Sequence, residues 1–194
     1  WNMFSVCVNP ENPDMKAIFE PLINEALLIK IQDENGNALE DYGIIGGWIN
    51  NIGYIQVTKG YKIKVNDTCS IEITGTPAGF PLTIPLKAGW NIMGYPPEQE
   101  ADGKEMVRQL IERGTLVKVQ DEAGNAIEDF GILGGWQNFI GNFEPGEGYK
   151  IKVTTGEILT IEENQHPPLT GKLVSYFGCK DFNGTFMDYA ITDA

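Results

Sequence analysis

The sequence predicts an α+β fold that is mainly β, made of two tandem homologous repeats, each a small antiparallel sheet with one helix. The stretch QDENGNALEDYG at residues 32–43 returns 88 positions later as QDEAGNAIEDFG at residues 120–131. The hexapeptide GYKIKV occurs at residues 60–65 and again at residues 148–153. Only one segment in each repeat has helical spacing. A duplication of this length sets the architecture, so the structural unit is about half the chain.

These observations divide the chain into three parts. We expect repeat 1 at residues 1–81 and repeat 2 at residues 82–164. Residues 165–194 are expected to form a linker and the start of a different C-terminal segment, because the turn-forming Gln-His-Pro-Pro stretch at residues 165–168 ends the similarity.

Each repeat opens with an apolar segment, residues 1–8 and 90–95, whose aromatic and β-branched content predicts a strand. An apolar helical stripe follows. Its members are Ile18, Phe19, Leu22 and Ile23 in repeat 1 and Met106, Val107, Leu110 and Ile111 in repeat 2. Residues 12–14 predict the helix start, with Asn12 as the N-cap, Pro13 in the first turn and Asp14 as an acid near the positive end of the helix dipole. Pro21 lies within the stripe, so we expect it to kink or shorten the first helix.

The remainder of each repeat predicts antiparallel strands. Hairpin turns are expected at Asn35-Gly36 and Ala123-Gly124. The following segments, residues 41–45 and 129–133, are expected to continue as strands as far as the glycine pairs, where the chain should bend. In GYKIKV the tyrosine, isoleucine and valine should face the core while the lysines face solvent. One more strand is expected at residues 69–74 and 157–162.

One predicted strand has no partner copy at the start of repeat 1. Leu82–Leu86 precedes the opening strand of repeat 2 and is predicted to form a hairpin with it. Repeat 1 has no such segment ahead of Trp1, so an upstream stretch or another element has to cover that edge. Residues 172–177 fall in the register of this same strand.

Composition excludes some functions and leaves others open. The formal net charge is -13, and no segment concentrates Lys and Arg, so we expect no nucleic-acid partner. Solubility explains this acidity better than cation binding or an acidic cell-surface setting. No apolar run is long enough to insert into a membrane. The three cysteines do not form a zinc motif, which leaves either a Cys7–Cys69 bridge or buried thiols.

A calcium site is conceivable in the acidic turns, because hard cations take several oxygen ligands. A polar hairpin turn explains both copies better, since the glycine is misplaced for an EF-hand and Ala123 replaces Asn35. No other cofactor is expected. The candidate ligands are Asp33, Asn37 and Asp41 in repeat 1 and Asp121, Asn125 and Asp129 in repeat 2.

Aromatic residues near the glycine pairs are the candidates for ligand binding. Trp48 and Trp136 each follow two glycines, and Tyr42 and Phe130 could complete a flat apolar surface for a sugar. The alternative, that these rings fill the core, is favoured. It is favoured more strongly for Trp1 and Trp90, which lie in patterned strands.

The chain is not expected to be an enzyme. The adjacent carboxylates Glu40-Asp41 and Glu128-Asp129 would point to opposite faces of a strand and could not converge on one substrate atom. The only histidine, His166, is followed by two prolines and has no neighbouring serine or cysteine to activate.

Three segments resemble a known tandem module: IPLKAGWNIMGYP at residues 84–96, LVKV at residues 116–119 and GEGYKIKV at residues 146–153. The pattern is similar to the "GWNLIGYP…GxGYxVxV" repeats of large secreted and surface proteins of Bacteroidetes-type bacteria. The resemblance covers residues 1–163. It implies an exported, non-catalytic module whose partners are other domains of the same longer protein, other surface proteins or glycans.

The expected function is therefore a non-enzymatic extracellular structural or adhesive repeat module of a secreted or cell-surface protein. The alternative is a carbohydrate-binding module that uses the loop tryptophans. An accessory domain of a secreted hydrolase is the least favoured hypothesis.

Overall fold

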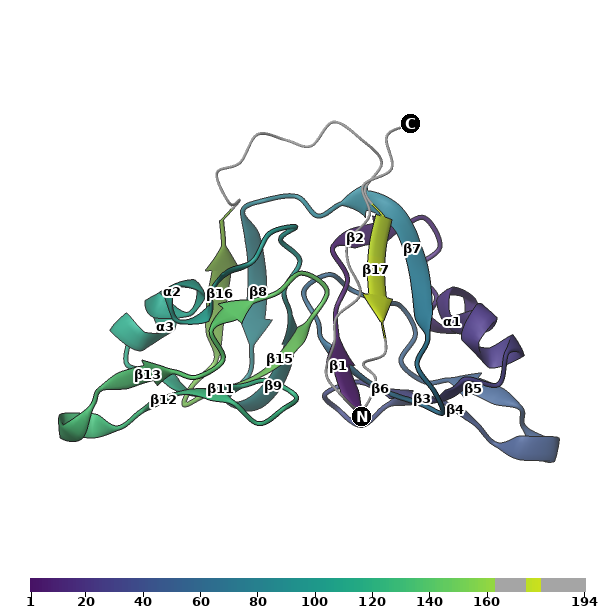
Figure 1. Ribbon diagram of the computed structural model, residues 1–194, viewed down its shortest axis with the longest axis horizontal. Helices are drawn as coiled ribbons and strands as arrows, with labels where there is room; N and C mark the ends of the chain where they lie inside the picture. The colour runs from purple at the N-terminus through teal and green to yellow at the C-terminus, as the bar shows by residue number, and fades with distance from the viewer. Residues whose placement is uncertain (163–173, 179–194) are drawn as a thin grey trace.

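The computed structural model describes residues 1–162 and 174–178, and in this part of the chain strands predominate (Figure 1). The mainly β, α+β fold class is thereby confirmed. Residues 163–173, which include the predicted linker at residues 165–168 with His166, and residues 179–194, with Cys179, lie outside the described residues.

Repeat 1 is built on a five-stranded antiparallel sheet with the strand order β1-β6-β3-β4-β5. Its elements are β1 (Asn2–Phe4), β2 (Val8–Pro10), α1 (Met15–Asn24), β3 (Leu28–Gln32), β4 (Ala38–Asp41), the 3-10 turn η1 (Gly43–Ile45), β5 (Trp48–Asn50), β6 (Tyr61–Val65) and β7 (Ser70–Pro77).

Repeat 2 has the corresponding sheet order, β9-β15-β11-β12-β13. Its elements are β8 (Leu82–Leu86), β9 (Gly89–Gly94), β10 (Ala101–Asp102), α2 (Gly103–Met106), α3 (Arg108–Glu112), β11 (Leu116–Gln120), β12 (Ala126–Asp129), η2 (Gly131–Leu133), β13 (Trp136–Asn138), β14 (Asn142–Phe143), β15 (Gly148–Val153) and β16 (Glu157–Ile161). A further strand, β17 (Val174–Gly178), lies along β7.

The two sheets agree in register as well as in order. Phe4 faces Tyr61 across β1 and β6, and Met93 faces Tyr149 across β9 and β15. The repeats therefore fold alike around the two GYKIKV strands. The predicted alternation in these strands is confirmed, since Tyr61 and Ile63 are buried while Lys64 is exposed.

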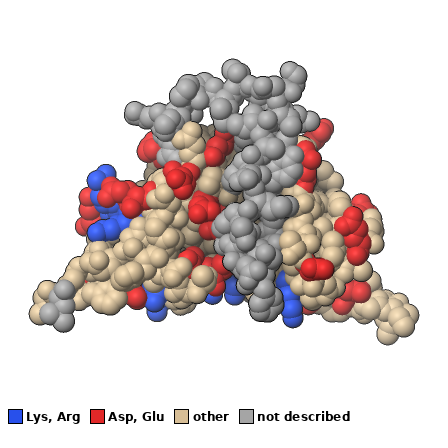
Figure 2. All heavy atoms as spheres, in the orientation of Figure 1, with Lys and Arg blue, Asp and Glu red and all other residues tan. Residues whose placement is uncertain are grey.

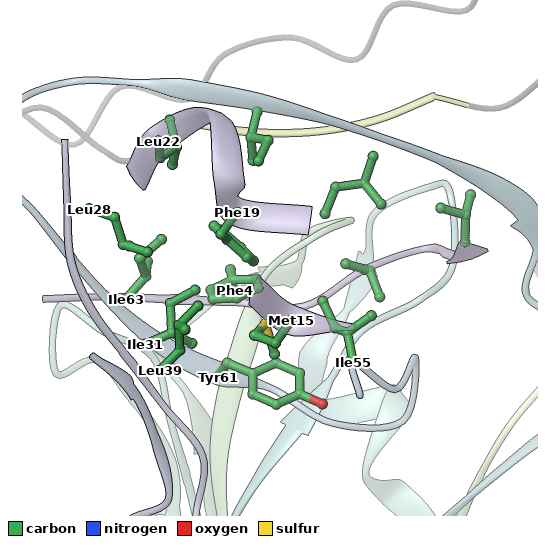
Figure 3. Close-up of a cluster of buried hydrophobic side chains, with 14 of the residues drawn as sticks. Phe4, Met15, Phe19, Leu22, Leu28, Ile31, Leu39, Ile55, Tyr61 and Ile63 are labelled. Atoms are coloured by element: carbon green, nitrogen blue, oxygen red, sulfur yellow. The ribbon is translucent and has the colours of Figure 1, made fainter. Parts of the chain in front are cut away.

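In each repeat the helical segment covers the inner face of the five-stranded sheet. The core of each repeat lies between this helical segment and the sheet. In repeat 1 the ring of Phe4 lies between those of Phe19 and Tyr61, with ring centroids 5.5 Å apart in both pairs (Figure 3). The apolar stripe of α1 supplies Phe19 and Leu22, as the helical spacing predicts. Burial of these large side chains is the main stabilising term of the fold.

The helices differ from expectation. The predicted N-cap is wrong by two residues, because Asp14 and not Asn12 is the N-cap of α1 and accepts from Ala17 N at 2.9 Å, which leaves Pro13 before the helix. Pro21, however, neither shortens nor interrupts α1, whereas repeat 2 has Gln109 at the equivalent position and its helix is broken at Val107. Proline removes only one N–H, and the packing of Phe19 and Leu22 on the sheet is enough to hold α1 together.

The predicted hairpin between β8 and β9 is wrong. β8 pairs with β16, and β9 pairs with β15 in the five-stranded sheet. The side chain of Asn91 explains the change of direction, because its Oδ1 accepts from Lys87 N and its Nδ2 donates to the carbonyls of Lys87 and Gly89. This turn sends the chain from one sheet into another instead of folding it back.

The two repeats meet through contacts that come in matched pairs. Ser5 N donates to Gly146 O at 2.7 Å, and Gly94 N donates to Thr58 O at 3.2 Å. In the aligned repeats Ser5 corresponds to Gly94 and Thr58 corresponds to Gly146, so the same bond is made twice with the roles exchanged. The interface therefore has an approximate two-fold axis within one chain.

A second matched pair comes from the turns. Glu122 Oε2 accepts from Met3 N at 2.7 Å, and Glu34 Oε2 accepts from Ile92 N at 3.2 Å. The β3–β4 turn of one repeat and the β11–β12 turn of the other each reach the opening strand of the opposite repeat. These bonds join the two five-stranded sheets into one body with a repeat on either side (Figure 1).

Two glycines allow this close approach. A Cβ atom on Gly60 would lie 2.5 Å from Met93 O, and a Cβ atom on Gly148 would lie 2.9 Å from Phe4 O. Both glycines stand first in the duplicated hexapeptide, so the sequence GYKIKV encodes the interface as well as the strand.

Candidate functional site

The strand pair β4–β5 ends in a tip that projects from the body of repeat 1 (Figure 1), and we call its residues 42–47 tip 1. Gly43 and Gly47 have φ values of +69° and +56°, which favour glycine. Tyr42 N donates to Gly47 O, and Gly47 N donates to Gly43 O, both at 2.8 Å. Asp41 Oδ1 accepts from Gly43 N at 2.9 Å. Tip 1 is thus closed by its own backbone.

Repeat 2 builds the same device at residues 130–135, which we call tip 2. Phe130 N donates to Gly135 O at 2.9 Å, and Gly135 N donates to Gly131 O at 2.7 Å. Asp129 Oδ1 accepts from Gly131 N at 2.9 Å. The predicted continuation of strands into these segments is therefore wrong, because strand pairing stops at Asp41 and at Asp129 and a 3-10 turn follows.

The tips display aliphatic side chains to solvent. Ile44 and Ile45 in tip 1 and Ile132 in tip 2 are fully exposed. No charged side chain is visible on either tip in Figure 2, although the rest of that face is rich in acidic groups. Burying one such side chain in an interface would contribute about 1.5 to 3 kcal/mol. An apolar, duplicated projection that is closed by its own hydrogen bonds has the chemistry of a docking element.

The sequence-based choice of residues missed these isoleucines. The signal was present in the paired motifs GIIGG at residues 43–47 and GILGG at residues 131–135, where apolar side chains are enclosed by glycines. The sequence-based interpretation continued the strands through these residues and gave the isoleucines no role, whereas in the structure they are exposed.

The predicted aromatic residues lie at the bases of the tips. Tyr42 and Phe130 are 54% and 51% exposed. Phe130 packs edge to face on Phe139, with ring centroids 5.9 Å apart, whereas the position of Phe139 is occupied in repeat 1 by Asn51. The base of tip 2 therefore presents a larger aromatic surface than the base of tip 1.

Trp48 and Trp136 do not stand free. Both are partly buried and pack against the cores of their repeats. Lys16 Nζ donates to Trp48 O at 3.0 Å, and Lys104 Nζ donates to Trp136 O at 2.8 Å, so each helix is tied to the base of its tip. These tryptophans serve both as supports for the tips and as edges of the surface beside them.

An open hollow of about 660 Å³ lies beside Trp48. Its polar lining includes Lys30 and Glu40, which form an ion pair at 2.6 Å, and Asp41. The hydrogen bond from Lys30 holds the pKa of the Glu40 carboxyl below its usual range. A tryptophan edge with charged groups nearby is a surface that a sugar could use.

The expectation for the other two tryptophans is wrong. Trp1 and Trp90 are 59% and 49% exposed. Trp90 faces Lys152 across β9 and β15, on the solvent side of the sheet, and Lys152 Nζ lies 5.8 Å from the ring centroid. The apolar pattern of the opening strand indicated a strand correctly but placed these two rings on the wrong face.

The candidate calcium ligands are divided between two structures. Asp33 and Asn37 lie together, but Asp33 Oδ1 already accepts from the backbone N–H groups of Asn35 and Asn37. Asp121 and Asn125 repeat this arrangement. Asp41 and Asp129 lie instead at the tips. Within residues 1–162 and 174–178 no group of three or more His, Cys, Asp or Glu side chains could hold a metal ion.

The two cysteines of repeat 1 are both buried. No disulfide joins Cys7 to Cys69, both of which are described residues. Cys7 Sγ lies 3.9 Å from Pro97 O, which belongs to repeat 2. Cys7 therefore contributes to the packing between the repeats.

Basic residues that are far apart in the sequence lie on one face of the folded protein. Six lysines point to the outer face of the two five-stranded sheets, and some are visible along the lower edge in Figure 2. They are Lys30, Lys62, Lys64, Lys118, Lys150 and Lys152. Period-two alternation aligns them on one face of the pleat.

The comparisons add no relative. No family model, curated protein or solved structure matches this chain. In the described part of the chain no helix is long and apolar enough to cross a membrane. The candidate site therefore rests on the geometry of the tips and of the surface at their bases.

Proposed function

We propose that this chain is a non-enzymatic structural or adhesive module of a larger secreted or cell-surface protein, and that its two tips make the adhesive contacts with tips of neighbouring copies. The observation that carries the proposal is the duplication of a hydrogen-bonded tip with fully exposed isoleucines. The resemblance to surface-protein repeats supports the extracellular setting.

The geometry of the body suits a bivalent role. The repeats are locked together by reciprocal backbone bonds, such as Ser5 N to Gly146 O and Gly94 N to Thr58 O. The tips project on opposite sides of this body (Figure 1). Each copy can therefore contact two others at once.

A single tip is small, so one contact between tips is expected to be weak. Dense display on a surface changes this, because linking two weak contacts can raise the overall affinity by about 10²- to 10⁴-fold. Weak individual contacts and strong collective ones are suited to adhesion.

The test uses beads densely coated with the full chain, and aggregation is measured by light scattering. Wild-type beads should aggregate. Ile44→Ser with Ile45→Ser should weaken aggregation by removing tip 1. Adding Ile132→Ser should abolish it.

The matched control is Ile158→Ser, which removes an exposed isoleucine of β16 outside both tips. Melting temperatures should be unchanged in all variants, since surface substitutions alter stability by only about 0.5 kcal/mol. Beads that never aggregate, or that aggregate equally with both tips altered, would contradict the proposal.

A second candidate function, carbohydrate binding, is favoured by the hollow beside Trp48. A glycan that binds there should change tryptophan fluorescence, and Glu40→Gln should weaken the response by removing a charged acceptor. Glu128→Gln at the equivalent position in repeat 2 is the control. The absence of any response across a glycan panel would count against this candidate.

A further inference from the structure

The strand β7 in repeat 1 corresponds to β16 in repeat 2, and each has an antiparallel partner. β16 pairs with β8, so that Leu159 faces Ile84 and Ile161 faces Leu82. β7 pairs with β17, so that Ile71 faces Phe177. Ile71 is the residue aligned with Leu159. β17 therefore occupies on repeat 1 the register position that β8 occupies on repeat 2. Figure 1 shows β17 alongside β7 and β8 alongside β16.

The two partner strands arrive by different routes. β8 runs directly into β9, the opening strand of its own repeat. β17 instead comes from the C-terminal end of the described chain, after the whole of repeat 2. Repeat 1 is completed by a strand that is not contiguous with it in sequence.

The residues that accept this strand belong to the core of repeat 1. Ile71 and Ile73 of β7 are buried, as are Leu159 and Ile161 of β16. A strand edge next to buried core residues offers backbone hydrogen bonds and exclusion of water together. The edge of β7 has the properties of a site for strand addition.

We propose that the edge of β7 is a strand-binding site in which Val174–Gly178 is the ligand, held as an intramolecular replacement for the strand that β8 provides in repeat 2. The site takes an extended segment of about five residues through main-chain hydrogen bonds. Residues 174–178 thereby complete the sheet edge of repeat 1.

The register also predicts which amides matter. Pro85 of β8 faces Ile158 and has no N–H, so that position must be one whose N–H would point away from β16. Gly178 stands at the equivalent position of β17. Hydrogen bonding to an antiparallel neighbour alternates along a strand. The N–H groups of Ser175 and Phe177 should therefore bond to β7, while that of Gly178 should not.

The test is amide hydrogen exchange on two full-length variants. Ser175→Pro removes an N–H that should bond to β7 and is expected to speed exchange of the Ile71 and Ile73 amides, which face β17 in this register, by at least about tenfold, a loss of roughly 1.4 kcal/mol in local opening free energy. Gly178→Pro places proline where β8 already has one, and it should leave exchange unchanged. The amides of β16 serve as the internal reference in both variants.

Three results would overturn the proposal. Unchanged exchange of β7 in Ser175→Pro would show that the edge does not depend on this strand. Equal losses in the two variants would contradict the shared register with β8. Protection of wild-type β7 that grows with protein concentration would show that a second copy supplies the strand, and would refute the intramolecular assignment.

Discussion

The two repeats share one topology but fill their cores differently. Repeat 1 places Met15 and Ile55 where repeat 2 has Gly103 and Phe143. A Cβ atom on Gly103 would lie 2.7 Å from Phe143 Cε1, so the phenylalanine ring occupies the space that a side chain at position 103 would need. The comparison teaches that the pattern of strands tolerates exchange of core volume between neighbouring positions.

At two other core positions repeat 1, and not repeat 2, has the larger side chains. Phe4 and Phe19 of repeat 1 correspond to the smaller Met93 and Val107 of repeat 2, all four of them buried. Phe143 compensates in repeat 2 by stacking on Tyr149, with ring centroids 4.1 Å apart. Each core therefore has an aromatic cluster around the tyrosine of GYKIKV, built from different positions.

The glycine at the shared interface, in contrast, is the same in both repeats, as Gly60 and Gly148. At this interface Gly60→Ala should be the most damaging single change, at about 3 kcal/mol of unfolding free energy, because the new Cβ would lie 2.5 Å from the backbone oxygen of Met93, which cannot move aside as the end of a side chain can. Gly148→Ala should cost less, since its clash with Phe4 O is at 2.9 Å and not at 2.5 Å.

Chemical denaturation measures both values. Gly53→Ala is not a suitable control because Gly53 has a positive φ. A Cβ atom on Gly79 would have no other atom within 4 Å, and the φ of Gly79 is not positive. Gly79→Ala should therefore be nearly neutral. Equal stability of Gly60→Ala and Gly79→Ala would mean that the repeats do not meet as described.

The exchange of core volume can be tested by introducing the core residues of repeat 1 at the equivalent positions of repeat 2. Phe143→Ile should destabilise repeat 2 by about 2 kcal/mol through the cavity it leaves. Gly103→Met alone should destabilise it by about 1 to 3 kcal/mol through overpacking. The double variant recreates the pair found in repeat 1 and should recover at least about 1 kcal/mol relative to the sum of the two. A double-mutant cycle from denaturation curves gives this coupling, and additive effects would refute the compensation.

The smallest predicted difference concerns the buried tyrosines. Burial raises the pKa of Tyr61 to about 12. Burial also raises the pKa of Tyr149, and the carboxylate of Glu147, which accepts from Tyr149 Oη at 2.8 Å, raises it further. The position of Glu147 is occupied in repeat 1 by Lys59. The neutral hydroxyl is therefore favoured in both folded repeats, and more strongly in repeat 2.

In the folded protein these pKa values lie above the unfolded value of about 10. The contribution of the neutral tyrosines to the unfolding free energy is therefore fully present below pH 10 and is lost as the pH rises through the folded pKa. Above pH 10 each buried tyrosine should lower the unfolding free energy by up to about 1.4 kcal/mol per pH unit. For Tyr61 this decrease should continue until about pH 12. Unfolding free energy measured from pH 9 upward should fall less steeply in Tyr61→Phe and in Tyr149→Phe than in the wild type. Parallel curves for all three proteins would show that the hydroxyls ionise freely.

Much of the fold followed from local pattern. The duplication, the alternation in GYKIKV and the apolar stripe of Phe19 and Leu22 predicted the sheet, its facing and the helix. Their signal is local, because a strand or helix with one buried face must repeat its apolar residues at the period of its own backbone. A helix start at residues 12–14 was predictable for the same reason, although the cap is Asp14 and not Asn12.

The candidate site was less accessible to such reasoning. Tyr42 and Phe130 were placed near a binding surface, yet Ile44, Ile45 and Ile132 were missed because an apolar residue beside a strand pattern is usually buried. The positive φ of Gly43 turned the tip away from the sheet. That preference is visible in sequence only as glycine, and glycine permits many conformations without selecting one.

The amino-acid sequence by itself determined the repeat unit, its strands and helix, and which faces of the GYKIKV strands are buried. Only the tertiary structure decided how the units join. Gly60 and Gly148 face the opposite repeat, β8 pairs with β16 and not with β9, and β17 completes repeat 1. The physical reason is range. Periodicity records the environment of a residue along its own element, whereas strand partners are chosen among segments distant in sequence, by packing and by satisfaction of backbone hydrogen bonds.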